Sequence, residues 1–249
     1  MIEVSTEIFA NIECLHATPA GKRDEPLPTI LFYHGFTSSK EVYSYFGVAL
    51  AQAGFRVILP DAAMHGSRYS GDTETRLGAF WDILKSNIDE LPLLEAALRQ
   101  QNLVASGRLA VAGASMGGMT ALGAMARYSH LASVACLMGS GYFMSLSHTL
   151  FPPLVVTTPE QKKTFAARMA PLAEYDVSQQ LEKLADRPLL VWHGEADEVV
   201  PAAESVRLEK ALREAKLDAR LTFLTEKGIG HRITPPALEA VAAFFQHHL

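Results

Sequence analysis

The sequence has little cysteine, and this scarcity excludes one class of protein. Its only cysteines are Cys14 and Cys136, which lie far apart, and Cys136 sits within an apolar run. A small secreted fold stapled by disulfides would need more of them. We therefore expect two buried free thiols, which suit a reducing compartment.

Clustered basic charge and long hydrophobic runs are also missing. The formal net charge is −5, and the densest basic stretch is the pair Lys162 and Lys163. Duplex binding normally needs a basic patch, so we expect no nucleic-acid partner. No run approaches the roughly 20 apolar residues of a spanning helix, and Met1 to Glu7 lacks the pattern of a secretory signal. The expectation is a cytoplasmic protein without membrane insertion.

What the sequence does contain is a series of short, unbroken apolar runs separated by longer amphipathic stretches. Strands that are covered on both faces have this pattern. The runs are Ile30 to Tyr33, Val57 to Leu59, Leu109 to Ala112, Val134 to Met138 and Leu189 to Trp192, and a further apolar stretch lies at Leu221 to Leu224. Alternation of such runs with helices predicts an α/β fold with a mostly parallel sheet and helices on both faces. A chain of 249 residues fits one domain, residues 1–249, better than two.

Start and stop signals place several helices between these runs. Ser38 and Ser39 can cap a helix that runs to about Ala53, where a glycine follows. The stretch from Glu74 to Gln101 has the pattern of one long helix, or of two with a break at Pro92. At the other end of the chain, Thr234 can cap the last helix.

Two segments depart from the strand–helix rhythm. Glu3 to Ala17 has the pattern of an antiparallel strand pair at one edge of the sheet. About fifty residues separate the strands near Met138 and Pro188, more than a βα unit needs. The excess, at about 142–186, is rich in apolar residues and includes an amphipathic helix around 159–169. We expect it to form a small helical cap over the C-terminal edge of the sheet.

The segment Gly113-Ala114-Ser115-Met116-Gly117 matches the pattern G-x-S-x-G. It follows a predicted strand directly and opens a helix of small residues, which is the context that makes the pattern specific for a nucleophile. Such a turn forces Ser115 into a strained backbone conformation, and the two glycines let strand and helix approach closely. Ser115 is therefore the predicted nucleophile. The alternative is a glycine turn with an inert serine.

A serine hydroxyl needs a base, and the base needs an acid partner. Asp197 lies just past the strand that ends at Trp192, and it is the predicted acid, with Glu195 and Glu198 as competitors. His231 follows a glycine-flanked loop after the last strand and is the predicted base. The order Ser, Asp, His along the chain is the one that this kind of fold uses.

Two backbone N–H groups should converge on the oxyanion that acyl transfer creates. One is predicted to be that of Met116, directly after the nucleophile, and the other that of Phe36, in the loop after an early strand. We expect His34 to brace this loop and the segment 61–67 to support the site. The nine histidines and two cysteines show no metal-ligand spacing, so neither a metal nor another cofactor is expected.

These motifs together resemble the α/β-hydrolase superfamily from about residue 28 to the end of the chain. The motifs are His34-Gly35-Phe36, Pro60-Asp61 with His65-Gly66-Ser67, Gly113-x-Ser115-x-Gly117-Gly118, His193-Gly194-x-x-Asp197-x-x-Val200-Pro201 and Gly230-His231. Within the superfamily the chain is similar to dienelactone hydrolases and the catalytic domains of prolyl oligopeptidases, and most similar to small bacterial carboxylesterases. The resemblance implies a sheet of about eight strands.

The resemblance also implies hydrolysis of an ester. Dienelactone hydrolases carry a cysteine as nucleophile where this chain has Ser115, which favours ester hydrolysis over lactone opening. The peptidases carry a propeller domain for which we find no sequence here. We therefore expect a serine carboxylesterase that acts on a small molecule with a short- to medium-chain acyl group. An acyl-CoA thioesterase, a small peptidase, a perhydrolase and a non-catalytic binding module stay open, and the sequence says nothing of oligomeric state.

Overall fold

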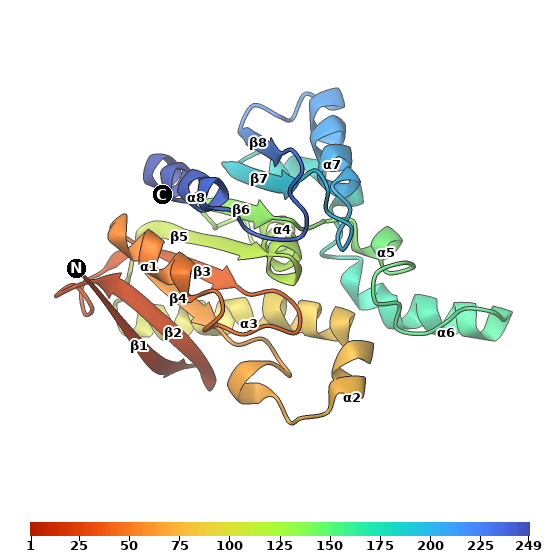
Figure 1. Ribbon diagram of the computed structural model, residues 1–249, viewed down its shortest axis with the longest axis horizontal. Coiled ribbons are helices and arrows are strands. Elements are labelled where there is room, and N and C mark those ends of the chain that lie inside the picture. Colours follow the sequence, from red (N-terminus) through yellow and green to blue (C-terminus); the bar gives the residue numbers. More distant parts are fainter.

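An eight-stranded sheet forms the centre of the computed structural model, which describes residues 1–249 (Figure 1). The strands lie in the order β1-β2-β4-β3-β5-β6-β7-β8. Their bounds are β1 (Ile2–Phe9), β2 (Ile12–Pro19), β3 (Leu27–Tyr33), β4 (Arg56–Pro60), β5 (Val104–Ala114), β6 (Ser133–Leu137), β7 (Leu189–Gly194) and β8 (Leu221–Glu226). From β4 to β8 every neighbouring pair is parallel, and β2 runs antiparallel to both of its neighbours. The predicted parallel sheet and the antiparallel pair at its edge are both confirmed.

Helices cover both faces of this sheet. Their bounds are α1 (Ser44–Gln52), α2 (Thr73–Gly78), α3 (Phe80–Gln100), α4 (Met116–Arg127), α5 (Phe143–Leu146), α6 (Pro159–Met169), α7 (Ala203–Glu214) and α8 (Pro235–His248). Side chains of α1 and α8 share one apolar cluster with the sheet, and those of α3, α4 and α7 share another on the opposite face. None of the helices combines the length and the apolar character needed to cross a bilayer.

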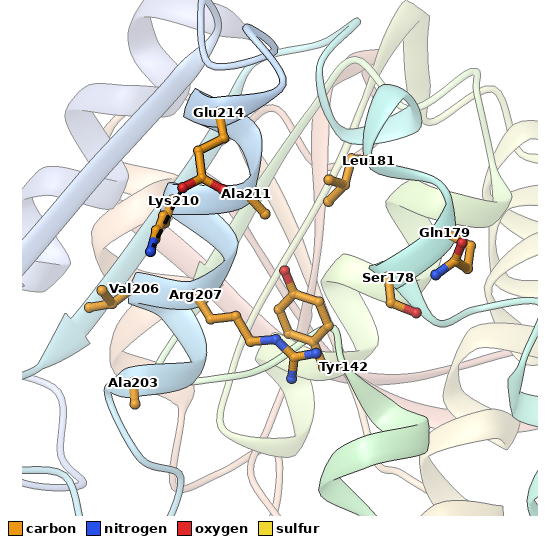
Figure 2. Close-up of a pocket in the computed structure, with 10 residues that line it drawn as sticks. All are labelled: Tyr142, Ser178, Gln179, Leu181, Ala203, Val206, Arg207, Lys210, Ala211 and Glu214. Atoms are coloured by element: carbon orange, nitrogen blue, oxygen red, sulfur yellow. Dashed lines mark ion pairs between the residues drawn. The ribbon is translucent and has the colours of Figure 1, made fainter.

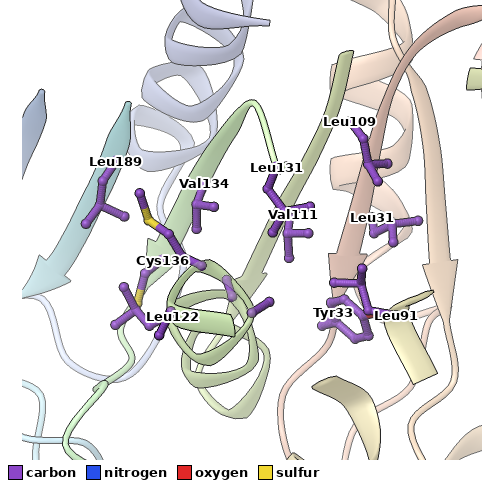
Figure 3. Close-up of a cluster of buried hydrophobic side chains, with 14 of the residues drawn as sticks. Leu31, Tyr33, Leu91, Leu109, Val111, Leu122, Leu131, Val134, Cys136 and Leu189 are labelled. Carbon is purple, nitrogen blue, oxygen red and sulfur yellow. The ribbon is translucent and has the colours of Figure 1, made fainter. Parts of the chain in front are cut away.

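The strands show why their sequences are continuously apolar. In β3, Ile30 and Phe32 belong to the apolar cluster shared with α1 and α8. Leu31 and Tyr33 belong to the cluster on the other face, together with side chains of α3 and α4 such as Leu91 and Leu122 (Figure 3). All four residues of β3 are buried. A strand with helices on both faces has no polar side, so the period-two alternation of a half-exposed strand is absent.

The first helix begins later than predicted. It starts at Ser44, with Tyr43 as the residue before it, and not just after Ser39. Residues 40–43 form turns instead, because the buried Lys40 side chain is drawn inward to the carboxylate of Asp61, 2.6 Å away. The predicted stop is correct, since Gly54 follows the helix with a φ of +104°.

The long helical stretch is divided in two, but not at Pro92. The break lies at Ala79, between α2 and α3, and Pro92 is inside α3. A proline removes the hydrogen bond that the carbonyl four residues earlier would accept. Here that carbonyl belongs to Ile88, and the Tyr128 hydroxyl donates to it at 2.9 Å. The freed group is therefore satisfied, and the helix continues past the proline.

The segment from Tyr142 to Asp186 contains α5, α6 and three short 3₁₀ turns. Helix α6 has the predicted bounds and begins at a capping box in which Thr158 and Gln161 exchange hydrogen bonds. In Figure 1 it extends away from the sheet on the side of α2. Arg168 joins it to the carboxylate of Asp82 in α3 at 2.9 Å.

Candidate active site

Ser115 lies in the sharp turn between β5 and α4. Its backbone has φ of 58° and ψ of −119°, a region that residues other than glycine rarely adopt, as the motif predicts. The turn is held by the Ser115 N–H, which donates to the carbonyl of Leu137 at 2.9 Å. A Cβ on Gly117 would overlap the carbonyl of Tyr33, which is why a glycine is needed there.

The structure brings Ser115, His231 and Asp197 together from three different segments. The Ser115 Oγ lies 2.9 Å from His231 Nε2, and His231 Nδ1 lies 2.7 Å from Asp197 Oδ2. Because the carboxylate can only accept, Nδ1 carries the proton and Nε2 is left to accept from the serine. This tautomer is the one that a general base needs.

Asp197 is buried, and its carboxylate is fully engaged. Its Oδ1 accepts from the N–H groups of Val199 and Val200, at 2.9 and 3.0 Å. Burial alone would raise the pKa of Asp197, but hydrogen bonds from His193 and His231 outweigh it and hold this pKa well below its usual range. The competing carboxylate of Glu195 instead accepts from Thr225 at 2.8 Å. Glu198 is exposed.

The two predicted oxyanion donors stay predictions, and the geometry around them is compatible with the role. Met116 is the first residue of α4, and the first N–H groups of a helix have no partner within it. The Phe36 N–H has no hydrogen-bond partner inside the protein. The loop that carries it runs beside the nucleophile, since a Cβ on Gly35 would lie 3.5 Å from the Cβ of Ser115.

Two neutral histidines fasten this loop to the segment after β4. His34 Nε2 accepts from the N–H of Ala62 at 3.0 Å. In return, His65 Nε2 accepts from the N–H of Thr37 at 2.8 Å. Burial lowers the pKa of His34 to about 4 and also lowers the pKa of His65, so both stay neutral acceptors. This bears out the bracing role that the sequence predicts for His34.

A buried ion pair adds a second connection between the same two loops. Lys40 is 1% exposed, and its Nζ lies 2.6 Å from Asp61 and 2.8 Å from both Glu13 and Glu41. Asp61 also accepts from the N–H of Ser67 at 2.9 Å. Segment 61–67 therefore supports the loop that carries Phe36, as expected.

An apolar cavity of about 220 Å³ opens onto Ser115 and His231. Its other lining residues are Phe36, Thr37, Phe80, Met119, Leu150, Phe151, Val199 and Val200. Phe36, Phe80 and Phe151 form a triangle in which each pair of ring centroids is 4.9 Å apart. Because the three rings come from three separate segments, sequence reasoning did not identify this wall.

A larger hollow of about 570 Å³ lies elsewhere, between α7 and the segment that precedes β7 (Figure 2). Arg207 stacks over the ring of Tyr142 at 3.7 Å there, and Lys210 faces Glu214 at 3.7 Å. It contains Ser178 but no histidine that could act as a base. No group of three or more His, Cys, Asp or Glu side chains is placed to hold a metal ion.

Acid should loosen the loop that carries Phe36, because His34 must stay neutral to accept from Ala62. An unfolded histidine has a pKa near 6.5, so the unfolded chain takes up a proton as pH falls from 6.5 to 4, while folded His34 does not. The difference between these two pKa values corresponds to about 3 kcal/mol of stability lost between pH 6.5 and pH 4. Urea unfolding at pH 7, 5.5 and 4.5 should show this loss, and His34→Gln, whose amide can donate and accept at the same places, should reduce it. If the free energy of unfolding of His34→Gln falls with pH as steeply as that of the wild type, the loss does not come from His34. His247→Gln, at an exposed position, serves as control.

Comparison with known proteins places this geometry in a family. The model of the prolyl oligopeptidase family matches residues 48–249. Esterase YjfP of Escherichia coli strain K12 is 54% identical over 249 residues, and YitV of Bacillus subtilis strain 168 is 33% identical over 259 aligned residues, in each case over the whole of both chains. The crystal structure of TT1662 from Thermus thermophilus superposes with a TM-score of 0.78 at 25% identity, and covers 99% of this chain and 98% of that one.

Proposed function

Because this chain belongs to the prolyl oligopeptidase family and is a serine hydrolase, we propose that it is a carboxylesterase that cleaves short- to medium-chain acyl esters. The observation that carries the proposal is the unbroken hydrogen-bonded series from Asp197 through His231 to Ser115, which opens into an apolar cavity. The relative that is named an esterase matches the chain from end to end, which supports an ester as the substrate.

The proposed reaction proceeds through an acyl-enzyme. His231 Nε2 takes the proton of the Ser115 hydroxyl as Oγ attacks the ester carbonyl. The N–H groups of Phe36 and Met116 hold the oxyanion, and the imidazolium returns its proton to the departing alkoxide. Water then attacks the acyl-enzyme by the same route, which releases the acid and restores Ser115.

We assign the apolar cavity to the acyl group. Its volume of about 220 Å³ is below the roughly 300–1,000 Å³ of pockets for drug-sized ligands, which favours short chains. Leu150 and Phe151 enter its wall from the segment at 142–186, and the indole N–H of Trp81 holds the carbonyl of Leu150 at 3.1 Å. This supports the assignment of that segment as a cap on a single domain. The two free, buried cysteines support a cytoplasmic location.

A panel of p-nitrophenyl esters tests the substrate class, with the acetyl, butyryl and octanoyl esters compared with an amino-acid p-nitroanilide and an acyl-CoA. We expect the highest kcat/KM at butyryl or shorter chains. Phe151→Ala opens the wall, so its octanoyl-to-butyryl ratio of kcat/KM should rise roughly tenfold or more, given about 0.8 kcal/mol for each methylene buried.

Val155→Ala is the matched control, because Val155 belongs to the same segment but lies outside this cavity and is 73% exposed. Its acyl preference should equal that of the wild type. A wild-type protein that cleaves the anilide faster than every ester would make it a peptidase, and one that prefers the acyl-CoA would make it a thioesterase.

A further inference from the structure

A second histidine reaches the same carboxylate oxygen that orients His231. His193, the penultimate residue of strand β7, places its Nε2 3.2 Å from Asp197 Oδ2 and 2.9 Å from the carbonyl of Val200. The sequence motif contains His193, but the predicted chemistry gives it no role. Its side chain is completely buried, so it contacts neither solvent nor the cavity.

The surroundings of His193 fix which nitrogen carries the proton. Both groups near Nε2 are acceptors, so this nitrogen must be a donor. On the other side of the ring, Nδ1 lies 2.6 Å from the hydroxyl of Ser205, which can donate to it or accept from it. Ser205 is itself buried and lies 3.4 Å from the carbonyl of Gly139. His193 is thus held on both sides: its Nε2–H donates to the carbonyl of Val200, and the same nitrogen lies 3.2 Å from Asp197 Oδ2.

With His193 in place, four N–H groups surround the two oxygens of Asp197. The N–H groups of Val199 and Val200 bond Oδ1, while Oδ2 lies 2.7 Å from His231 Nδ1 and 3.2 Å from His193 Nε2. These two histidines are the only titratable side chains within hydrogen-bonding distance of the carboxylate. A carboxylate with donors on every side cannot rotate about its Cβ–Cγ bond without losing some of them.

We propose that His193 is a positioning residue for hydrolysis: it locks the carboxylate of Asp197 in the orientation that His231 requires and shares its negative charge. This inference rests on the proposed function of Ser115, His231 and Asp197. Without the Nε2–H of His193, the carboxylate still faces His231 but no longer holds the imidazole at the angle that proton transfer from Ser115 requires. The remaining charge on Oδ2 then also acts on His231 alone and stabilises its protonated form more strongly.

The test compares His193→Phe, which keeps a planar ring but no nitrogen, with His193→Gln, whose amide can still donate. We expect His193→Phe to lower kcat roughly ten- to a hundredfold, the cost of misplaced reacting groups, while KM changes by less than about twofold. The acid limb of its kcat/KM profile should move up by roughly half a pH unit. His193→Gln should restore most of the wild-type kcat and bring the acid limb back close to its wild-type position.

His16→Gln is the control for the loss of a buried histidine. His16 lies in β2 and bonds Arg56 at 2.9 Å, away from the cavity, so its loss should lower thermal stability without moving the pH profile. A His193→Phe protein with wild-type kcat, or with lower kcat and an unmoved profile, overturns the proposal. Should that variant fail to fold, Ser205→Ala decides, because it removes the partner of Nδ1 and should shift the profile in the same direction.

The rate at which a fluorophosphonate probe labels Ser115 separates this proposal from the esterase assignment, because labelling needs no ester. If the wild type hydrolyses no ester, but the probe labels His193→Phe more slowly than the wild type, the esterase assignment is wrong and the role of His193 stands. Equal labelling of wild type and variant, in a protein that does hydrolyse esters, would sink the role of His193 alone.

Discussion

Ser115→Ala is expected to lower kcat for p-nitrophenyl butyrate by roughly 10⁴-fold or more, the size of loss that removal of a serine nucleophile produces. Without Oγ there is no atom to form the acyl-enzyme, and His231 has no hydroxyl to deprotonate. The variant should fold normally, because alanine and serine share the Cβ that the strained turn already accommodates. Fluorophosphonate labelling, read as a mass increase of the intact protein, should disappear with the activity.

Ser178→Ala is a suitable control for this experiment. Ser178 is exposed and lines the larger hollow beside α7, where no histidine is available. It should keep wild-type activity and labelling. If Ser115→Ala retained more than a tenth of the wild-type kcat, the nucleophile would have to be another residue, and the mass spectrum of the labelled peptide would identify it.

Asp197→Asn should lower kcat about 10⁴-fold, because it changes the tautomer of His231 while leaving the size and shape of the side chain at position 197 nearly unchanged. The amide oxygen must face the N–H groups of Val199 and Val200, since an NH₂ group there would meet two donors, whereas the Nε2–H of His193 at the other position can still donate to the carbonyl of Val200. The NH₂ group then faces His231 Nδ1, which must give up its proton to accept. The proton moves to Nε2, where it faces Ser115 and removes the base.

Glu195→Gln and Glu198→Gln make the same chemical change on the same loop and should leave kcat close to that of the wild type. Circular dichroism and thermal unfolding would check that Asp197→Asn still folds. A large loss in Glu198→Gln together with little loss in Asp197→Asn would move the acid to the other carboxylate. Comparable losses in all three variants would indicate a general effect of charge on this loop.

The strands could be predicted from the sequence because a strand that is buried on both faces appears as a short continuous run of apolar residues. Leu109–Ala112 in β5 and Leu189–Trp192 in β7 are continuous apolar runs, and each ends where a polar site residue follows. The same local pattern predicted where Ser115, Asp197 and His231 lie along the chain. Parallel strands carry their C-terminal ends to one edge, so the order of motifs was enough to propose that the three meet.

The features that were missed depend on contacts between residues far apart in the sequence. Helix α1 starts late because Lys40 reaches Asp61, and α3 continues past Pro92 because Tyr128 reaches Ile88. No local pattern contains either pairing. The position of His193 beside Asp197 follows from the path of the loop after β7, which the sequence does not specify.

The ring and the backbone of Phe36 face two different parts of the proposed substrate. Its ring belongs to the aromatic triangle that bounds the acyl cavity, and its N–H is a proposed oxyanion donor. We therefore expect an acyl group that is too large for the cavity to press on this ring and to shift the N–H away from the carbonyl oxygen. An acyl group that fits the cavity poorly would then raise the barrier of the chemical step, because the Phe36 N–H matters most when negative charge develops on the carbonyl oxygen. The size of the acyl group would then affect kcat more than it affects KM.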